Sequence, residues 1–272
     1  MTNKAEIQVA VAGLGAIGKV LATQLDAGRI GGCRLAAISG RDPDRTAAFV
    51  AGLSTPVSVV PLAALPERAA VIVECAPSAL LSQVVEPALK AGRKVVVLSV
   101  GALLERPALL ELARAGQGQI LVPSGALLGL DAVTAAAEGR IESVRMVSRK
   151  PPGGFKGAPF VEQNDIDLDH LSEPLQLYAG SARGAAKGFP ANLNVSVALA
   201  LAGIGPDRTQ IEVWADPGVV RNTHHIEVVS DAALLHMTIE NIPSENPKTG
   251  RITAQSVIAL LRKLSAPVRI GT

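Results

Sequence analysis

An apolar run that passes directly into three spaced glycines constrains the fold of this chain more than any other feature. Residues 7–12 have the composition of a buried strand, and they lead into Gly13-Leu14-Gly15-Ala16-Ile17-Gly18. In such a turn the first glycine permits a sharp bend, the second lets the backbone approach a pyrophosphate, and the third lets the next helix pack close to the sheet. The N–H groups and positive dipole end of that helix then face the phosphates. This order of elements predicts a dinucleotide site.

A rival motif, the P-loop, overlaps the same glycines. Gly13, Gly18 and Lys19 fit its first part, in which glycines cradle phosphates ahead of a Lys and a Ser or Thr. Here the residue after Lys19 is Val20, which has no hydroxyl to hold Mg²⁺. Gly15 is also the additional glycine that a dinucleotide turn requires. We therefore favour a dinucleotide site over nucleotide hydrolysis.

The first 125 or so residues alternate between strand and helix patterns. The predicted strands are rich in Val and Ile without polar alternation, which is typical of a parallel sheet buried on both faces. They cover residues 7–12, 33–39, 70–76, 94–99 and 119–123, with helices predicted at 16–27, 43–52, 78–91 and 106–115. The pattern predicts an α/β fold with an N-terminal Rossmann-type, doubly wound parallel sheet.

The pattern changes after Leu130. Segment 140–149 interleaves charged and apolar residues, and we expect a strand there. Segments 210–215, 224–230 and 234–240 alternate as well, and we expect antiparallel strands with one solvated face. Residues 173–201 are helix-rich, and a last helix begins near Thr253. We expect a dinucleotide-binding domain over 1–125 and an α+β substrate and dimerisation domain over 126–250. The C-terminal segment 251–272 could pack back on the first domain.

Composition excludes several classes of function. Hydrophobic residues make up 48% of the 272 residues, but aromatic residues only 2%, so Ala, Val, Leu and Ile must build the core. A net charge of +2 gives no reason to expect a nucleic acid partner. No apolar run approaches the ~18–20 residues of a membrane span, and the N-terminus has no signal core. Cys33 and Cys75 lack metal or redox spacing. We expect a cytoplasmic protein with reduced thiols.

The end of the second predicted strand bears on the choice of cofactor. An NAD site typically has a carboxylate there, which binds the ribose hydroxyls. This strand instead ends in Ser39-Gly40-Arg41-Asp42. Arg41 and Ser39 could accommodate the 2′-phosphate of NADP, while Asp42 is close enough to keep NAD possible. Arg41 and Asp42 could also be only a solvated turn pair before Pro43. We expect use of both cofactors, with a preference for NADP.

Three further loops follow predicted strands at the sheet edge where an open parallel sheet binds its ligand. They cover residues 75–78, 99–102 and 123–126, and all three contain small residues. Structural turns could explain each loop separately. Together they favour room for a flat nicotinamide and ribose.

The four histidines are His170, His224, His225 and His236. None belongs to a His-Glu-x-x-His helix, no Cys/His group has metal-ligand spacing, and no Gly-x-Ser-x-Gly elbow is present. We therefore expect neither a metal site nor a hydrolase. On a strand, His224 and His225 would point to opposite faces. Histidine is the usual general acid or base near neutral pH, although a structural role for His224 stays open on this pattern alone.

Several separated stretches together resemble the L-aspartate dehydrogenase family. The most specific are Phe189-Pro190-Ala191-Asn192-Leu193-Asn194-Val195, Asn222-Thr223-His224 and Asn246-Pro247-Lys248-Thr249-Gly250-Arg251. Residues 13–18, 73–76, 99–103 and 123–126 add to them. The resemblance spans nearly the whole chain in order, although the glycine triplet is common to many dehydrogenases.

The resemblance implies NAD(P)-dependent oxidative deamination of L-aspartate, in which hydride leaves Cα for nicotinamide and gives iminoaspartate. Water then releases oxaloacetate and ammonia, or the imine feeds NAD biosynthesis. Family members are typically homodimers. The catalytic histidine maps onto His224, or onto His225 if the strand register shifts by one, and two cofactor contacts map onto Ala126 and Asn192. The full set of expected cofactor-binding residues is Gly13, Gly15, Ala16, Ile17, Gly18, Arg41, Ala76, Pro77, Ala126 and Asn192.

The two substrate carboxylates call for cationic or N–H partners. The candidates, which the sequence does not rank, are Arg149, Lys187, Arg221, Lys248 and Arg251. Two other functions fit the same architecture. One is a reductase similar to dihydrodipicolinate reductase, whose histidine pair and lysine motif have no clear match around residues 151–170. The other is a non-catalytic NAD(P)-binding sensor, which the presence of His224 disfavours.

Overall fold

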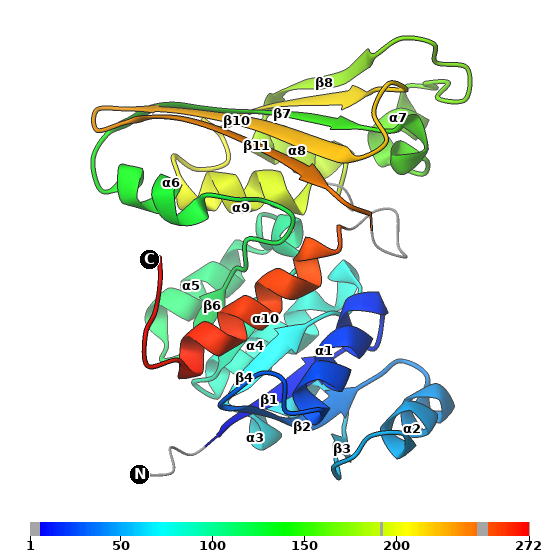
Figure 1. Cartoon of the computed structure of the whole chain (residues 1–272), viewed down its shortest axis with the longest axis vertical. Helices are drawn as coiled ribbons and strands as arrows, with labels where there is room; N and C mark the ends of the chain where they lie inside the picture. The colour runs from blue at the N-terminus through cyan, green and yellow to red at the C-terminus, as the bar shows by residue number, and fades with distance from the viewer. Residues whose placement is uncertain (1–5, 191–192, 244–249, 272) are drawn as a thin grey trace. The chain divides into compact units, whose positions relative to one another are not determined.

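The computed structural model describes residues 6–190, 193–243 and 250–271, and it divides into two compact units. The first unit contains the described residues up to Pro123 together with residues 254–270. The second contains the described residues from Ser124 to Thr253, with Gly271. Each unit has its own sheet and its own hydrophobic core (Figure 1).

The first unit is built on a sheet of six strands in the order β3-β2-β1-β4-β5-β6. The registered pairs are all parallel. The strands are β1 (Ile7–Ala12), β2 (Cys33–Ser39), β3 (Ser58–Val59), β4 (Val71–Glu74), β5 (Lys94–Val97) and β6 (Gln119–Leu121). This is the strand order of a doubly wound dinucleotide-binding sheet, so the predicted Rossmann-type fold is confirmed.

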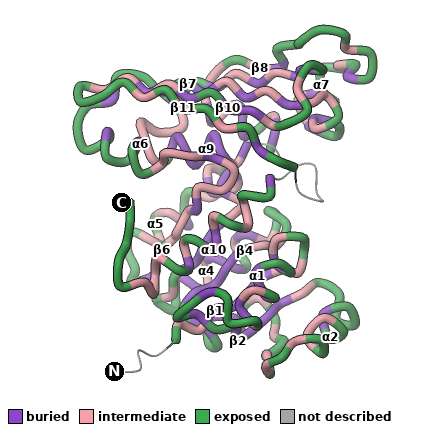
Figure 2. The backbone as a smooth tube through the Cα atoms, viewed as in Figure 1, coloured by how far each residue is buried: buried purple, intermediate pink, exposed green. Residues whose placement is uncertain are grey.

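Helices pack on both faces of this sheet, and their short connections to the strands follow the alternating pattern of the sequence. They are α1 (Ala16–Asp26), α2 (Pro43–Ala51), α3 (Leu65–Arg68), α4 (Leu81–Lys90), α5 (Pro107–Ala115) and α10 (Ile252–Ser265). Short 3₁₀ turns lie at η1 (Leu62–Ala64), η2 (Ser78–Leu80) and η3 (Val100–Leu103). The central strands are buried along most of their length, as Figure 2 shows.

The C-terminal helix α10 contributes to the core of the first unit, far in sequence from the strands that it covers. Its Val257 and Leu261 are fully buried in the cluster that contains Leu35. The Cys33 thiol donates to the Leu261 carbonyl at 3.6 Å, and the Ser265 hydroxyl donates to the carbonyl of Gly31 at 2.7 Å. Burial raises the pKa of the Cys33 thiol. The helix therefore completes the apolar layer beside β2.

The second unit has a mixed sheet of five strands in the order β11-β10-β7-β9-β8. The strands are β7 (Ile141–Lys150), β8 (Leu175–Ser181), β9 (Gln210–Ala215), β10 (Asn222–Ser230) and β11 (Leu234–Asn241). β10 pairs antiparallel with β11 and with β7, and β8 pairs antiparallel with β9, whereas β7 and β9 run parallel. The antiparallel arrangement expected for residues 210–215, 224–230 and 234–240 therefore holds between β10 and β11, while β9 has one parallel neighbour. A parallel pair needs a long crossover, and the connection from β7 to β9 contains helices that allow it.

Strand β8 lies inside a segment that the sequence pattern indicates as helix-rich. Only Leu177 is buried in this edge strand, so the alternation that marks a half-buried strand is weak. The strand forms because β9 supplies a partner along its length. Tertiary pairing thus overrides local pattern here. The predicted helices follow it as α8 (Ala182–Gly188) and α9 (Asn194–Ala202).

One face of the second sheet is covered and the other is open (Figures 1 and 2). Helices α6 (Leu130–Ala137), α8 and α9 lie on the covered face, where Met146 and Ile226 are buried with residues of α9. The η4 turn (Pro152–Phe155) and α7 (Pro159–Gln163) bring aromatic rings to this core. The rings of Phe155 and Phe160 contact that of Phe189 at centroid distances of 5.7 and 5.3 Å. Among the described helices, none has both the length and the apolar composition to cross a bilayer.

Candidate functional site

The turn after β1 has the geometry that its glycines predict. Gly13 has φ of +105°, and a Cβ there would lie 2.6 Å from the carbonyl oxygen of Cys75. A Cβ on Gly18 would lie 2.0 Å from the Gly13 carbonyl oxygen. Any residue larger than glycine at either position would therefore clash with the neighbouring backbone. At Gly15, by contrast, a Cβ would meet no described atom within 4 Å. Gly15 is thus the glycine whose small size leaves backbone accessible.

Helix α1 begins directly at this turn, with Gly15 as its N-cap residue and no hydrogen bond from a described side chain to its first turn. Ala16 is exposed and Ile17 half-buried, while Gly18 packs against the sheet. Free N–H groups at a helix N-terminus carry partial positive charge. The turn and helix start therefore fit the pyrophosphate of a dinucleotide.

The loop after β4 adjoins the glycine turn, because a Cβ on Gly13 would also lie 2.9 Å from the backbone nitrogen of Ala76. Ala76 is half-buried and Pro77 is exposed. Just before them, the Glu74 carboxylate is fully buried and accepts from the backbone N–H groups of Leu98 and Ser99 at 3.0 and 2.9 Å. Burial raises the pKa of Glu74. The hydrogen bonds from these N–H groups and from the Ser99 hydroxyl stabilise the ionised carboxylate and oppose this shift without reversing it. Glu74 thereby ties the loop after β5 to the loop after β4.

The end of β2 carries the residues that bear on cofactor choice. Arg41 is exposed, and Ser39 is buried with its carbonyl accepting from the Gly13 N–H at 2.7 Å. The Asp42 carboxylate caps α2 by accepting from the Arg45 N–H at 3.0 Å, and it pairs with the Arg45 guanidinium at 3.4 Å. Asp42 is therefore engaged at the helix start, which leaves Arg41 as the exposed charged group next to the strand end.

His224 is buried on the covered face of the second sheet. It stands opposite Ser148 on β7 and Ile239 on β11, and only 2% of its surface is exposed. Burial lowers the pKa of His224 to about 3, and Coulombic interactions with Lys150 and with His225 lower it further. The imidazole is therefore neutral near pH 7.

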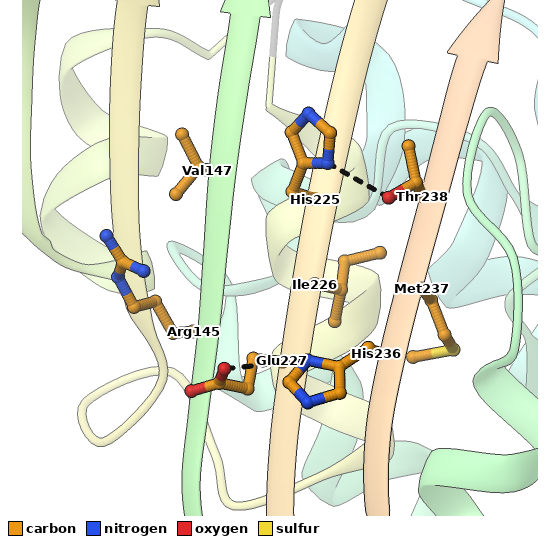
Figure 3. A pocket seen from close by; sticks show the side chains of 8 residues that line it. All are labelled: Arg145, Val147, His225, Ile226, Glu227, His236, Met237 and Thr238. Carbon is orange, nitrogen blue, oxygen red and sulfur yellow. Dashed lines mark hydrogen bonds and ion pairs between the residues drawn. The ribbon is translucent and has the colours of Figure 1, made fainter.

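His225 points to the opposite, open face, as strand alternation predicts (Figure 3). Its Nδ1 lies 2.9 Å from the hydroxyl of Thr238. It lines a shallow pocket with Arg145, Glu227 and His236. His236 and Glu227 approach to 3.5 Å across this surface. The two adjacent histidines thus occupy entirely different environments.

Three buried polar residues, which the sequence pattern does not single out, surround His224. They are Ser148, Lys150 and Asn241. The Ser148 hydroxyl, His224 Nδ1 and the Asn241 side-chain oxygen have no hydrogen-bond partner among the described residues. The Asn241 amide donates to the carbonyl of Ala126 at 3.0 Å. Buried polar atoms without partners are rare and need an explanation, and a bound ligand supplies one. We take Ser148, Lys150, His224 and Asn241 as the candidate site of the second unit.

The sequence of β7 contains a pattern from which this site could have been predicted. On its covered face the strand continues from the apolar Val144 and Met146 to the polar Ser148 and Lys150. A strand whose core-facing positions turn polar at one end indicates a site rather than core.

Four of the cations that the sequence nominates for substrate carboxylates lie in the described part of the chain, and none of the four is buried. Arg149 pairs with Asp216 at 3.0 Å and stacks 4.7 Å over the Trp214 ring. Arg221 is exposed 3.7 Å from Glu240. Lys187 and Arg251 are exposed as well. The two remaining nominated residues, Lys248 and Asn192, lie outside the described residues. Within the described part of the chain, no group of three or more His, Cys, Asp or Glu residues could hold a metal ion.

Two family profiles together match most of the chain. The profile described as "Homoserine dehydrogenase, NAD binding domain" matches residues 13–123. The profile described as "Aspartate dehydrogenase, C-terminal" matches residues 131–264. The first covers the glycine turn and the parallel sheet, and the second covers the sheet that carries His224.

Curated relatives match over the full length of the chain. The chain is 72% identical over 272 residues to L-aspartate dehydrogenase 3 of Bordetella bronchiseptica, with both proteins covered completely. It is 58% identical to the L-aspartate dehydrogenase of Bradyrhizobium diazoefficiens, which covers 100% of this chain and 96% of that protein. Among solved structures, the aspartate dehydrogenase of Thermotoga maritima has the same fold, with a TM-score of 0.71 and 23% identity over 98% of this chain and 100% of that one.

The burial of His224 leads to a prediction about stability. The usual histidine pKa of 6.5 applies to the unfolded chain, which takes up a proton here as the pH falls through that value, whereas the folded chain does so only at about 3. The unfolded state binds more protons in this window, so the free energy of unfolding falls as the pH is lowered. We expect His224→Gln, neutral at every pH, to lose less melting temperature than the wild type between about pH 7 and about pH 5. The matched control is His225→Gln, which removes an imidazole from the exposed face instead of the buried one. Equal slopes for the wild type and His224→Gln would contradict the assignment.

Proposed function

This chain belongs to the L-aspartate dehydrogenase family, and from that premise we propose that it converts L-aspartate with NAD(P)⁺ to iminoaspartate. Hydrolysis then gives oxaloacetate and ammonia, unless the imine passes to NAD biosynthesis. The observation that carries the proposal is the buried, neutral His224 among polar atoms that lack partners, on the sheet that the aspartate dehydrogenase profile matches. Full-length identity of 72% to a protein named L-aspartate dehydrogenase supports the choice of substrate.

The first unit supplies the cofactor site in this proposal. When bound, the nicotinamide accepts the hydride that leaves Cα of the substrate. The accessible backbone at Gly15 and the first N–H groups of α1 would hold the pyrophosphate. Ala76, Pro77 and Ala126 would line the cofactor, and Asn192 is proposed with them from the family resemblance. Arg41 would bind the 2′-phosphate of NADP, while NAD remains usable because this contact adds affinity without completing the site.

His224 would handle the proton in the reaction. As the C–H electron pair leaves Cα, the nitrogen lone pair forms the C=N bond and a proton must leave the nitrogen. A neutral imidazole can accept that proton and can then activate the water that attacks the imine carbon. A pKa of about 3 makes His224 a weak base without substrate. Because a nearby anion favours the protonated imidazole, a bound carboxylate would strengthen it as a base.

We also propose a homodimer, as the family resemblance implies. In this view residues 1–125 bind the cofactor, residues 126–250 bind the substrate and form the dimer, and the remaining residues add the C-terminal helix.

The proposed activity is tested by incubating the purified protein with NAD⁺ or NADP⁺ and a panel of L-amino acids while following the absorbance of the reduced nicotinamide. We expect turnover with L-aspartate and none of comparable rate with L-glutamate, L-alanine or L-lysine. Activity with another substrate in place of aspartate would refute the proposed substrate. Cofactor binding without any turnover would instead indicate a sensor.

The two adjacent histidines form a matched pair for a second test. His224→Ala should lower kcat by roughly 10²-fold or more, as expected when a general acid or base is lost, and should leave cofactor affinity nearly unchanged. His225→Ala should retain most of the activity because its side chain lies on the open face. The opposite outcome would assign the chemistry to His225.

Arg41 provides a test of cofactor choice. An exposed charge contact with a phosphate contributes about 1–2 kcal/mol, so Arg41→Ala should raise KM for NADP⁺ by about tenfold. KM for NAD⁺ should change less than twofold, because NAD⁺ lacks the phosphate. Arg45→Ala, at the start of α2, is the control for general loss of positive charge. Equal effects of Arg41→Ala on both cofactors would refute a contact with the 2′-phosphate.

A further inference from the structure

Lys150 lies beside His224 on the covered face of the second sheet. It is the last residue of β7, and its neighbour Arg149 pairs with Thr223 on β10. Lys150 therefore stands at the level of Asn222, which pairs with Asn241 on β11. Residues at the same level of adjacent strands share a face, and the next level on that face contains Ser148 and His224. Lys150 and His224 are thus diagonal neighbours.

Other charged residues of these strands lie on the opposite face. Arg145 and Val147 of β7 line the pocket of Figure 3 with His225. Ser148 and Lys150 alternate with them along β7 and are buried on the covered face. Asp216, whose N–H donates to the Lys150 carbonyl at 2.9 Å, pairs through its carboxylate with Arg149. Arg149 thus belongs to the charged residues of the open face, whereas Lys150 is buried on the covered face.

Lys150 is buried to an unusual degree for a lysine. Only 3% of its surface is exposed, and its ammonium lies 5.8 Å from the centre of the buried Phe155 ring. Burial lowers the pKa of Lys150 to about 8, so the ammonium still predominates at neutral pH. Removing an ammonium from water costs several kcal/mol, so a lysine is seldom buried without a role for its charge. A preorganised positive charge of this kind favours the binding of an anion.

The neighbouring groups complete an anion site. His224 is neutral, so it cannot balance the charge of a carboxylate. The Ser148 hydroxyl is a donor, and His224 Nδ1 and the Asn241 oxygen are further buried polar atoms without a described partner. One cation and several unsatisfied polar atoms on one small area of sheet match a charged ligand that also carries hydrogen-bonding groups.

We propose that Lys150 binds a carboxylate of the substrate next to His224, and this proposal rests on the proposed deamination of L-aspartate. Burial and, second to it, the positive charge of Lys150 keep His224 from taking up a proton in the free protein. When a carboxylate pairs with the ammonium, that repulsion is cancelled and the imidazole becomes a better base. Substrate binding and proton removal are thereby linked through a single buried ion pair.

The test compares Lys150→Met, which keeps the length but removes the charge, with Lys156→Met as the matched control. Lys156 is an exposed lysine of the same unit that pairs with Asp169. Loss of one partner of a buried charge pair costs about 2–5 kcal/mol, so Lys150→Met should raise KM for L-aspartate roughly 10²-fold. KM for NAD⁺ and NADP⁺ should stay within about twofold, and Lys156→Met should change neither.

Binding of succinate, a dicarboxylate with no amine to lose, gives a readout independent of turnover. Titration calorimetry should show binding to the wild type and to Lys156→Met, with a loss of roughly 10²-fold or more in Lys150→Met. Lys150→Arg retains the charge with a different shape, and its affinity should lie between those of the wild type and Lys150→Met. A purely structural role for Lys150 would instead lower the melting temperature of Lys150→Met and leave KM and succinate affinity unchanged.

The outcomes separate this proposal from the proposed function. If the wild type oxidises L-aspartate but Lys150→Met keeps the wild-type KM and succinate affinity, the role of Lys150 is refuted and the activity stands. If the wild type does not oxidise L-aspartate but binds succinate in a Lys150-dependent manner, the anion site stands and the activity is refuted. Should Lys150→Met fail to fold, the same measurements on Lys150→Arg and Lys150→Gln decide the matter. Failure of the wild type to bind succinate and to oxidise aspartate refutes both.

Discussion

The antiparallel pairing of β7 with β10 is the interaction on which the candidate site depends. It sets His224 opposite Ser148 and brings Lys150 to the adjacent level of the same face. Since strand side chains alternate, a shift of one residue would exchange His224 with His225 and carry the histidine to the open face. Register in this sheet is held by the apolar part of the same face, where Met146 and Ile226 are buried against α9. The core of the unit therefore determines which histidine is buried.

Burial gives the residues of this site their electrostatic character. An exposed histidine and lysine side by side would be ordinary solvated groups, but here burial lowers the pKa of His224 to about 3 and that of Lys150 to about 8. The pair therefore presents a neutral base beside a cation, which suits a substrate with an ionised carboxylate and a nitrogen that must lose a proton. This arrangement fits a chain of the L-aspartate dehydrogenase family. The first unit differs, because its glycine turn leaves backbone rather than side chains accessible at Gly15.

Close approach of backbone explains why parts of the first unit could be predicted so directly. Gly13 and Gly18 are required because a Cβ added at either position would lie less than 3 Å from a carbonyl oxygen. The sequence motif therefore reflects a local steric limit. Glu74 is a contrasting case, because its role in joining two loops depends on Ser99 and is visible only when β4 and β5 are paired. The parallel pairing of β7 with β9 and the edge strand β8 likewise depend on partners distant in sequence.

The sequence by itself determined the doubly wound sheet, the glycine turn and the alternation that separates His224 from His225. Each of these follows from short-range pattern, either the spacing of apolar residues or the conformational freedom of glycine. Only the tertiary structure decided which of many cations is buried beside His224, and that Ser148 and Asn241 accompany it. Burial of a charged side chain depends on strands and helices that converge from distant parts of the chain. For that reason Arg149 and Lys150, adjacent in sequence, differ in charge environment, and only Lys150 faces the candidate site.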